Sequence, residues 1–529
     1  MTLTRVNTSE SKQQGRAPRR QRPALELVSR GAGIALVLAV PLASVTYAAP
    51  LPAPSGDAGA GTAGVTVRVA DPSALYAQRT PPVPLEDNGV APLPGGSNAP
   101  NTARPPSAST PAAPGIPPNP YADVRWKGIV VNLPQASNTV DLGLGGFRQK
   151  LRDDYGIGYF GLSQTTFFSN VLNHAQRIGG QQVYVGQKPT VLSSNFLALI
   201  FDLSRYGIPD GQIVVVGSDQ ATSWNPLGPN SINLGTLSYY QTLFNKRLEI
   251  KAGLLATNTE FVGTFIGGSL NGGVFGPNGS IFGENGFGAL GYPQPGINIT
   301  GHITANIYDK IGVERALNPD GVVLEHNYNP TSVSRFYTPN TGPMVINELG
   351  YLRPATPGSV QTWVRGGAIL DKSRFNELDH PRRRSNNQYG LYLLGDRQLV
   401  QTSSAPGEAY RGLYAGFSAE YAPPNYDRFS QYYEARLYGL GLLPGRPLDQ
   451  VSLVFTENVF SNIAVNNFRA LRLATHKDSK ALTISYSAQV IHGVYANLGA
   501  QYVNNPSPIV YTGNTGSALN IIAGASLYF

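Results

Sequence analysis

The sequence predicts an all-β protein, an outer-membrane antiparallel β-barrel of about 16 strands, with a disordered N-terminal segment and one short helix. Three observations carry this prediction. The chain begins like an exported protein, its second half alternates apolar and polar residues, and its final segment ends on an aromatic residue, Phe529. The composition agrees: 60 Gly, 28 Tyr, no Cys and only 14% charged residues fit many short strands and turns better than a helical enzyme core.

Residues 1–48 are expected to be a signal peptide. A long basic region precedes an apolar stretch over 31–43, and Thr46, Tyr47 and Ala48 then offer the small residues that a signal peptidase prefers. The apolar stretch is shorter than the roughly 20 residues of a membrane helix, although a retained anchor stays an alternative. Much of the formal net charge of +8 lies in the first thirty residues, so the rest of the chain carries no basic face for nucleic acid.

Residues 49–120 are expected to form a disordered periplasmic segment. Of the 42 prolines, 16 lie between residues 51 and 120, and such a composition buries too little apolar surface to offset the entropy of ordering. A contact with the cell wall is the functional alternative to a plain spacer. The transmembrane barrel is expected over 121–529, preceded by a short helix over 145–155 that ends at Gly156.

A period of two dominates the rest of the chain. The clearest examples are the segments 413–421, 482–488, 494–502 and 519–529, in which alternate residues are apolar. A soluble sandwich with one wet face shows the same alternation. Here the polar face is rich in Gly, Ser, Tyr and Asn, and aromatic residues lie near strand ends, as a lipid interface requires. At about 50 residues per hairpin, 121–529 holds roughly sixteen strands, enough to enclose an aqueous channel.

Five segments of the sequence resemble the carbohydrate-selective porins. These are Tyr239–Phe244 with Leu248–Gly253 and Asn258–Phe261, then Asn347–Tyr351, Tyr389–Tyr392 with Gln398-Leu399, Tyr438-Gly439 with Leu443–Asp449, and Gln501–Pro506. The aromatic C-terminal residue is similar to the signal by which outer-membrane barrels are recognised for assembly.

The resemblance implies a sixteen-stranded porin of a Gram-negative outer membrane. Monosaccharides and related solutes would diffuse through it passively, without cofactor, metal or catalytic residue. Expected partners are such solutes, outer-membrane lipid and the barrel assembly machinery, with no nucleic acid, and the protein would be a monomer or a trimer.

The alternation also predicts which charged residues point into the channel, because side chains alternate across a strand. A charge facing lipid would cost about 2–4 kcal/mol at the midplane. The candidates for lining the pore and contacting the solute are Glu249, Lys251, Trp363, Arg365, Asp396, Glu420, Glu434 and Arg436, joined by Asn258 and Glu260 from the family-like segment. Mixed charges and aromatic faces suit weak, repeated binding of sugars. The alternative is that these are ordinary residues of a wet face.

Other motifs fit catalysis or phosphate binding poorly. The basic run from His380 to Arg384 is expected in an extracellular loop or one folded into the mouth, rather than on nucleic acid. The Gly-rich stretch 263–291 lacks the Gly-Lys-Ser/Thr ending of a phosphate loop and is expected to be a long loop. His492 lies in a predicted turn without an obvious catalytic partner. An outer-membrane barrel enzyme and a pore for other solutes or anions remain the alternative functions.

Overall fold

The computed structural model describes residues 124–130, 138–140, 145–172, 182–224, 230–262, 279–332, 335–405, 407–506, 509 and 516–529. The expected signal peptide and Pro-rich segment lie outside these residues, as does most of the Gly-rich stretch that follows Val262. No helix of the described part is long and apolar enough to cross a membrane.

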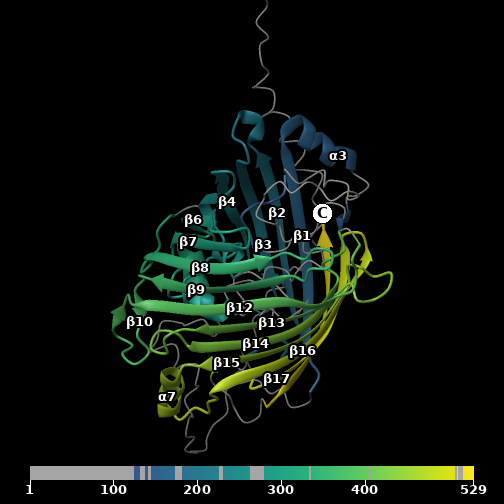
Figure 1. Cartoon of the computed structure of the whole chain (residues 1–529). Coiled ribbons are helices and arrows are strands. Elements are labelled where there is room, and N and C mark those ends of the chain that lie inside the picture. The colour runs from purple at the N-terminus through teal and green to yellow at the C-terminus, as the bar shows by residue number, and fades with distance from the viewer. Residues whose placement is uncertain are drawn as a thin grey trace, which may run out of the picture. The chain divides into compact units, whose positions relative to one another are not determined.

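The described chain forms a closed barrel of sixteen antiparallel strands, which confirms the predicted fold (Figure 1). The strands are β1 (Ile157–Asn170), β2 (Thr190–Asp202), β3 (Gln212–Thr222), β4 (Ser231–Leu243), β5 (Leu248–Leu255), β6 (Gln294–His302), β7 (Ile307–Arg315), β8 (Pro343–Arg353), β9 (Thr362–Asp371), β12 (Gln388–Gln401), β13 (Gly412–Tyr421), β14 (Phe429–Leu440), β15 (Gln450–Phe460), β16 (Asp478–Ile491), β17 (Val494–Asn504) and β18 (Ala518–Tyr528). Each strand pairs with the next, and β18 pairs with β1 to close the barrel.

Shorter helices, turns and one hairpin lie outside the barrel strands. They are α3 (Gly145–Lys150), the π-helical turn η3 (Leu151–Tyr155), the 3₁₀ turn η4 (Ser204–Tyr206), α4 (Thr257–Glu260), α5 (Gly279–Glu284), α6 (Val322–Tyr328), α7 (Asn462–Ala470) and a hairpin of β10 (Phe375–Asn376) with β11 (Arg384–Ser385). The helical segment over 145–155 was predicted, and it ends at Gly156 in the left-handed conformation with φ of 66°. His492 lies in the tight turn between β16 and β17, as expected.

The connections differ in length at the two ends of the barrel. At the end where the last strand finishes, strands are joined by compact turns such as 244–247, 303–306 and 492–493. At the other end lie the longest connections, 256–293 and 316–342, together with the β10–β11 hairpin and α7. Short periplasmic turns and long external loops are the usual arrangement in outer-membrane barrels. We call these the short-turn end and the long-loop end.

Alternation along the strands separates an apolar outer face from a polar interior. On β13 and β14, Phe417 and Leu437 are exposed on the outside at 41% and 43%, while their neighbours Ser418 and Arg436 are buried at 2% and 4%. The same holds on β16, where Leu482 is exposed and Thr483 is buried. One local departure occurs on β5. Leu254, which alternation from Leu248, Ile250 and Ala252 predicts on the lipid face, is instead buried at 7%, because Gly253 with φ of 138° interrupts the alternation.

The N-terminal part of the described chain lies against the inner wall. Trp126 packs in one cluster with inward-facing residues of β1, β2 and β3, including Phe160, Phe196 and Val214. The backbone N–H of Lys127 donates to Gln212 Oε1 at 3.0 Å, and that of Val130 donates to the Thr259 carbonyl at 2.9 Å. This segment therefore narrows the interior beside β3 and connects to the loop described next.

Candidate functional site

The described parts of the connection between β5 and β6, residues 256–262 and 279–293, fold into the barrel, and we call these two parts together the lumen loop. Its aromatic residues Phe261, Phe282 and Phe287 share a cluster with inward-facing residues of β8, β9 and β12, among them Ile346 and Tyr392. Burial of these side chains removes apolar surface from the water of the lumen, which favours the inward position.

The far side of the loop reaches other walls of the barrel. On α5, Glu284 accepts from Arg428 Nε at 3.0 Å and from the backbone N–H of Phe429 at 3.1 Å. Burial raises the pKa of Glu284, and Arg428 opposes that shift. Leu290 joins the cluster of Phe196 and Val216 on β2 and β3. The loop thus contacts the barrel wall on several sides and narrows the lumen.

The first cluster of charged residues joins β5 to α4. Lys251 Nζ lies 2.5 Å from Glu260 Oε1, and both side chains are almost fully buried. Lys310 on β7 donates to the Glu260 backbone carbonyl at 2.6 Å. Asn258, two residues earlier, is 4% exposed, and its Oδ1 has no hydrogen-bond partner among the described residues. Thr257 donates to the buried Glu314 on β7 at 2.5 Å. Two cations and two carboxylates therefore surround this end of the lumen loop.

The second cluster lies on β9, four strands along the barrel wall from β5, and also holds the loop. Arg365 donates to the backbone carbonyls of Phe261 at 2.8 Å and Val262 at 3.1 Å. Its guanidinium also lies over the ring of Trp363, 3.9 Å from the centroid. An arginine suits this position because its planar fork donates several hydrogen bonds and still stacks on an aromatic face. Arg365 therefore positions the loop as well as bringing charge to the interior.

Sequence reasoning missed the residues beside Arg365. Glu348 on β8 accepts hydrogen bonds from Tyr308 and Tyr392, both at 2.9 Å, and Trp363 Nε1 donates to Tyr308 at 3.2 Å. The signal was available, because Glu348 shares its face of β8 with the buried Met344 and Ile346.

The third cluster spans β12, β13 and β14. Arg436 donates to Asp396 at 3.0 and 2.7 Å and to Glu434 at 2.8 Å. Glu420 lies buried on the intervening β13, and neither of its carboxylate oxygens has a hydrogen-bond partner in the described part of the chain. Tyr438 Oη donates to Asp396 at 3.2 Å. One cation thus lies among three carboxylates, and the Glu420 carboxylate is buried without a hydrogen-bond partner among the described residues.

Glu249, the remaining candidate, lies apart from these clusters. It is half-buried at the start of β5, near the short-turn end, and its Oε1 is 2.9 Å from His302 Nε2 on β6. The structure therefore brings Lys251 together with Glu260, Trp363 with Arg365, and Asp396 with Glu420, Glu434 and Arg436, and it leaves Glu249 in a separate pair.

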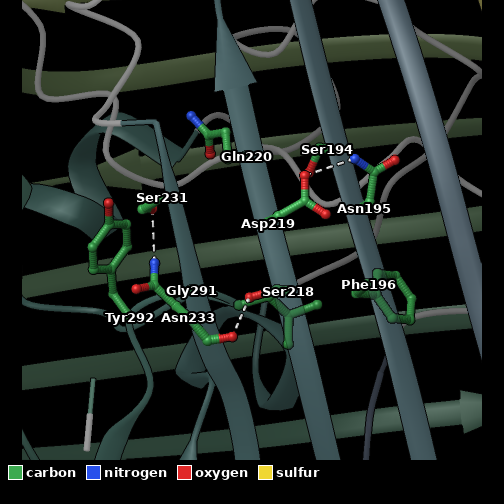
Figure 2. Close-up of a pocket in the computed structure, with 11 residues that line it drawn as sticks. Ser194, Asn195, Phe196, Ser218, Asp219, Gln220, Ser231, Asn233, Gly291 and Tyr292 are labelled. Atoms are coloured by element: carbon green, nitrogen blue, oxygen red, sulfur yellow. Dashed lines mark hydrogen bonds between the residues drawn. The ribbon is translucent and has the colours of Figure 1, made fainter. Parts of the chain in front are cut away.

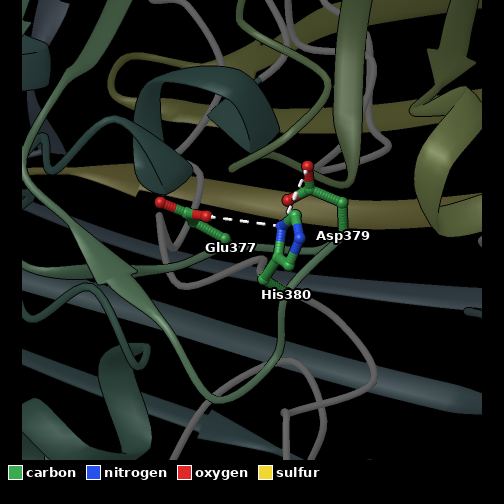
Figure 3. A group of neighbouring side chains, drawn as sticks. All are labelled: Glu377, Asp379 and His380. Atoms are coloured by element: carbon green, nitrogen blue, oxygen red, sulfur yellow. Dashed lines mark ion pairs between the residues drawn. The ribbon is translucent and has the colours of Figure 1, made fainter.

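The basic run after His380 lies at the long-loop end, between β9 and β12. Figure 3 shows Glu377, Asp379 and His380 close together, with His380 Nδ1 at 3.7 Å from Glu377 and 3.3 Å from Asp379. Glu377 also pairs with Arg383 at 3.2 Å. His380 is 65% exposed. We assign no metal site to this group, because one carboxylate already has a cationic partner and the imidazole lies open to solvent.

The sequence and the fold of this chain were compared with known proteins, and the matches are to porins. The family model "Carbohydrate-selective porin, OprB family" matches residues 160–515. A search of curated proteins finds no match. The high-pH structure of Pseudomonas putida OprB superposes with a TM-score of 0.62 at 14% identity, over 74% of this chain and 99% of that one.

Two further solved structures align less well. The low-pH structure of Pseudomonas putida OprB gives a TM-score of 0.44 at 13% identity, over 74% of this chain and 99% of that one. A mutant of the Rh. blastica porin gives 0.40 at 8% identity, over 70% and 100%. The structural likeness shows a porin fold. Since the family model spans most of the barrel, the chain belongs to the OprB family of carbohydrate-selective porins.

Proposed function

We propose that this protein is a passive outer-membrane pore for small carbohydrates, with its constriction where the lumen loop narrows the barrel beside the clusters around Arg365 and Arg436. One observation carries the proposal. Opposed charges and aromatic rings meet on the inner wall where the loop crosses the barrel, with Arg436 hydrogen-bonded to Asp396 and Glu434. The chain is a channel by family, and passage requires no chemical step.

The chemistry of these groups suits a polyhydroxylated solute. Carboxylates accept hydrogen bonds from sugar hydroxyls, and guanidinium groups donate to them. Aromatic rings such as that of Trp363 offer a surface for the apolar face of a pyranose. Each contact is weak, and a row of weak contacts lets a solute move from one to the next without being trapped. Binding of this kind favours sugars over apolar solutes of equal size.

Liposome swelling tests the proposal. Vesicles containing the purified protein are diluted into iso-osmotic glucose, arabinose, serine or potassium chloride. Glucose and arabinose should enter faster than their size alone predicts, and Arg436→Ala should reduce that preference. Equal rates for sugars and other neutral solutes of the same size would make the protein a general porin, and a preference for anions would assign it a different solute.

We further propose that residues 1–48 direct export and are removed, and that the mature protein resides in the outer membrane. The basic region, the short apolar stretch and Ala48 support this. N-terminal sequencing of protein from the outer-membrane fraction should begin at Ala49. A start before residue 31 would indicate a retained anchor. Cross-linking of the native protein distinguishes a monomer from a trimer.

A further inference from the structure

A row of polar side chains crosses the outer face of β1, β2 and β3, within the apolar band of the barrel. Its members are Ser163, Thr165, Ser193, Asn195 and Asp219. Each lies an even number of residues from an outward apolar residue of its own strand, namely Phe167, Leu197 or Val215, and so points away from the lumen. On β2 the outward residues on either side of the row, Val191 and Leu197, are 40% and 37% exposed.

Hydrogen bonds join these side chains across the three strands. Asn195 donates through Nδ2 to Asp219 Oδ2 at 2.9 Å, as Figure 2 shows, and to Ser193 Oγ at 3.2 Å. Thr165 donates to the same Ser193 oxygen at 3.4 Å. Asp219 has no cationic partner among the described residues. A carboxylate covered by hydrocarbon loses its hydration, so protein covers this face at a lower cost than lipid does.

The neighbouring strands keep this part of the wall flat. One row of paired residues crosses five strands from β17 to β3 without a side chain larger than threonine: Ala496, Ala525, Thr165, Ser193 and Ala221. A row of the same length from β13 to β17 contains Phe417, Ala435, Phe455, Leu482 and Tyr502. Small residues let two backbones approach closely within a membrane, and hydroxyl and amide groups then form hydrogen bonds across the contact.

A second polar pair on the outer face lacks these surroundings. Asn347 on β8 donates to Asp309 on β7 at 2.8 Å. Asp309 lies two residues after the start of β7, beside the short-turn end. The large outward residues Leu349 and Ile311 next to the pair are 54% and 46% exposed. This pair therefore gives a matched control for the row on β1, β2 and β3.

We propose that the outer face of β1, β2 and β3, with the adjoining part of β17 and β18, is the interface with a second copy of this chain. Copies inserted in the same direction are related by a rotation axis along the membrane normal. Such a rotation places the β1 side of one copy against the β3 side of the next. The hydroxyl groups of Ser163 and Thr165 then face the Asp219 carboxylate of the neighbouring copy, so the face is complementary to itself.

Thiol cross-linking tests this interface, because the chain has no cysteine of its own. Ser193→Cys places a thiol at the centre of the face, and Ala435→Cys places one at a small outward position on β14. In outer membranes, a short bismaleimide should link two chains of Ser193→Cys several-fold more efficiently than two chains of Ala435→Cys, since an assembled pair holds its thiols at a high effective concentration. Equal yields from the two variants, or linkage of Ser193→Cys to a different protein, would overturn the proposal.

Light scattering of the purified protein in mild detergent gives an independent measurement of assembly. Asp219→Leu should raise the dissociation constant of the oligomer about tenfold, as the loss of one hydrogen bond to a charged group implies. Asn347→Leu should leave the oligomer unchanged, and heat-modifiable mobility on gels verifies that both variants fold.

Three results would overturn the interface: a monomeric wild type, an oligomer that persists in both Asp219→Leu and Ser193→Trp, or an equal loss of the oligomer in Asn347→Leu. Swelling assays report on solute preference separately. A pore without sugar preference would therefore reject the proposed function and leave this interface in place.

Discussion

Arg436 and Asp396 are hydrogen-bonded across an intervening strand, at 3.0 and 2.7 Å, because the residue between them is Gly416. Gly416 on β13 pairs with Asp396 on one side and with Arg436 on the other. A Cβ at Gly416 would collide with Asp396 Oδ1 and lie 2.6 Å from Arg436 Nε. A glycine on the wall thus lets a long side chain lie flat over β13.

This relationship predicts the effect of removing the cation. Arg436→Ala leaves Asp396, Glu420 and Glu434 without their positive partner, so the interior becomes more negative. We expect the cation-to-anion permeability ratio to rise about twofold or more, and block by glucose to weaken. Reversal potentials in a salt gradient across a planar bilayer measure the first effect.

Two further variants separate the effect of the charge from other effects of the substitution. Gly416→Ala keeps every charge but disturbs the pair, so it should alter sugar block more than ion selectivity. Leu437→Ala, on the outer face, should alter neither. Unchanged selectivity and sugar block in Arg436→Ala would place the selecting groups elsewhere, on the loops.

Arg365 should control the width of the pore rather than its ion preference alone. Its guanidinium holds the Phe261 and Val262 carbonyls of the lumen loop. Arg365→Ala removes both hydrogen bonds, which contribute about 1.5–3 kcal/mol each when the donor is charged, less where water competes. We expect higher single-channel conductance and faster entry of disaccharides in swelling assays. Arg365→Lys keeps the positive charge but lacks the planar guanidinium group, so its conductance should lie between those of the wild type and Arg365→Ala. Wild-type conductance in Arg365→Ala would mean that the loop is held by its other contacts.

Charged substitutions on the outer face should destabilise the inserted barrel. Phe417 and Leu437 are exposed on the outside of β13 and β14. Phe417→Arg or Leu437→Arg should destabilise the inserted barrel by about 2–4 kcal/mol if the site lies near the midplane. The measurement is the fraction of heat-modifiable, folded protein on cold electrophoresis gels, with Leu437→Ala as the control. Normal insertion of both arginine variants would mean that this face does not contact lipid.

Barrel closure depends on Phe529 and Gly161. Their backbones exchange hydrogen bonds at 2.6 and 3.0 Å, and the Phe529 ring covers Gly161 so closely that a Cβ there would collide with it. Deleting Phe529, or introducing Gly161→Val, should lower the yield of folded barrel far more than Ser526→Ala. Gly217→Ala is the matched glycine control, since no atom lies within 4 Å of a Cβ built there. Normal membrane levels of the Phe529 deletion would argue against its role in assembly.

His476 should make the long-loop end sensitive to acid. It lies between α7 and β16, its backbone N–H donates to the Ile509 carbonyl at 3.3 Å, and burial lowers the pKa of its imidazole below 6.5. A depressed pKa favours the neutral ring in the folded state. Its stabilising contribution is therefore present above pH 6.5 and is lost as the pH falls through the folded value.

Hydrogen exchange measures this effect. Amides of α7 should exchange faster at pH 5 than at pH 7, after correction for intrinsic rates, and His476→Gln should remove that difference. A pH dependence that persists in His476→Gln would assign it to another group.

The local pattern of residues predicts the barrel and the two faces of its strands. Alternation of apolar and polar residues is a local property, and a charged side chain in lipid is costly. The alternation alone therefore predicts that Arg365, Asp396, Glu434 and Arg436 face the interior. The short helix ending at Gly156 and the turn at His492 were likewise local.

Contacts among the inward residues depend on the three-dimensional arrangement of the strands and loops. Alternation along each strand predicts that Lys251, Glu348 and Arg365 face inward. It does not predict that Lys251 pairs with Glu260 or that Arg365 donates hydrogen bonds to the lumen loop. These contacts depend on the strand order around the closed barrel and on a loop that folds inward to bury its phenylalanines. Both are long-range properties. The recess lined by Asn233 and Tyr292, for example, forms only because the end of that loop returns to β2, β3 and β4 (Figure 2).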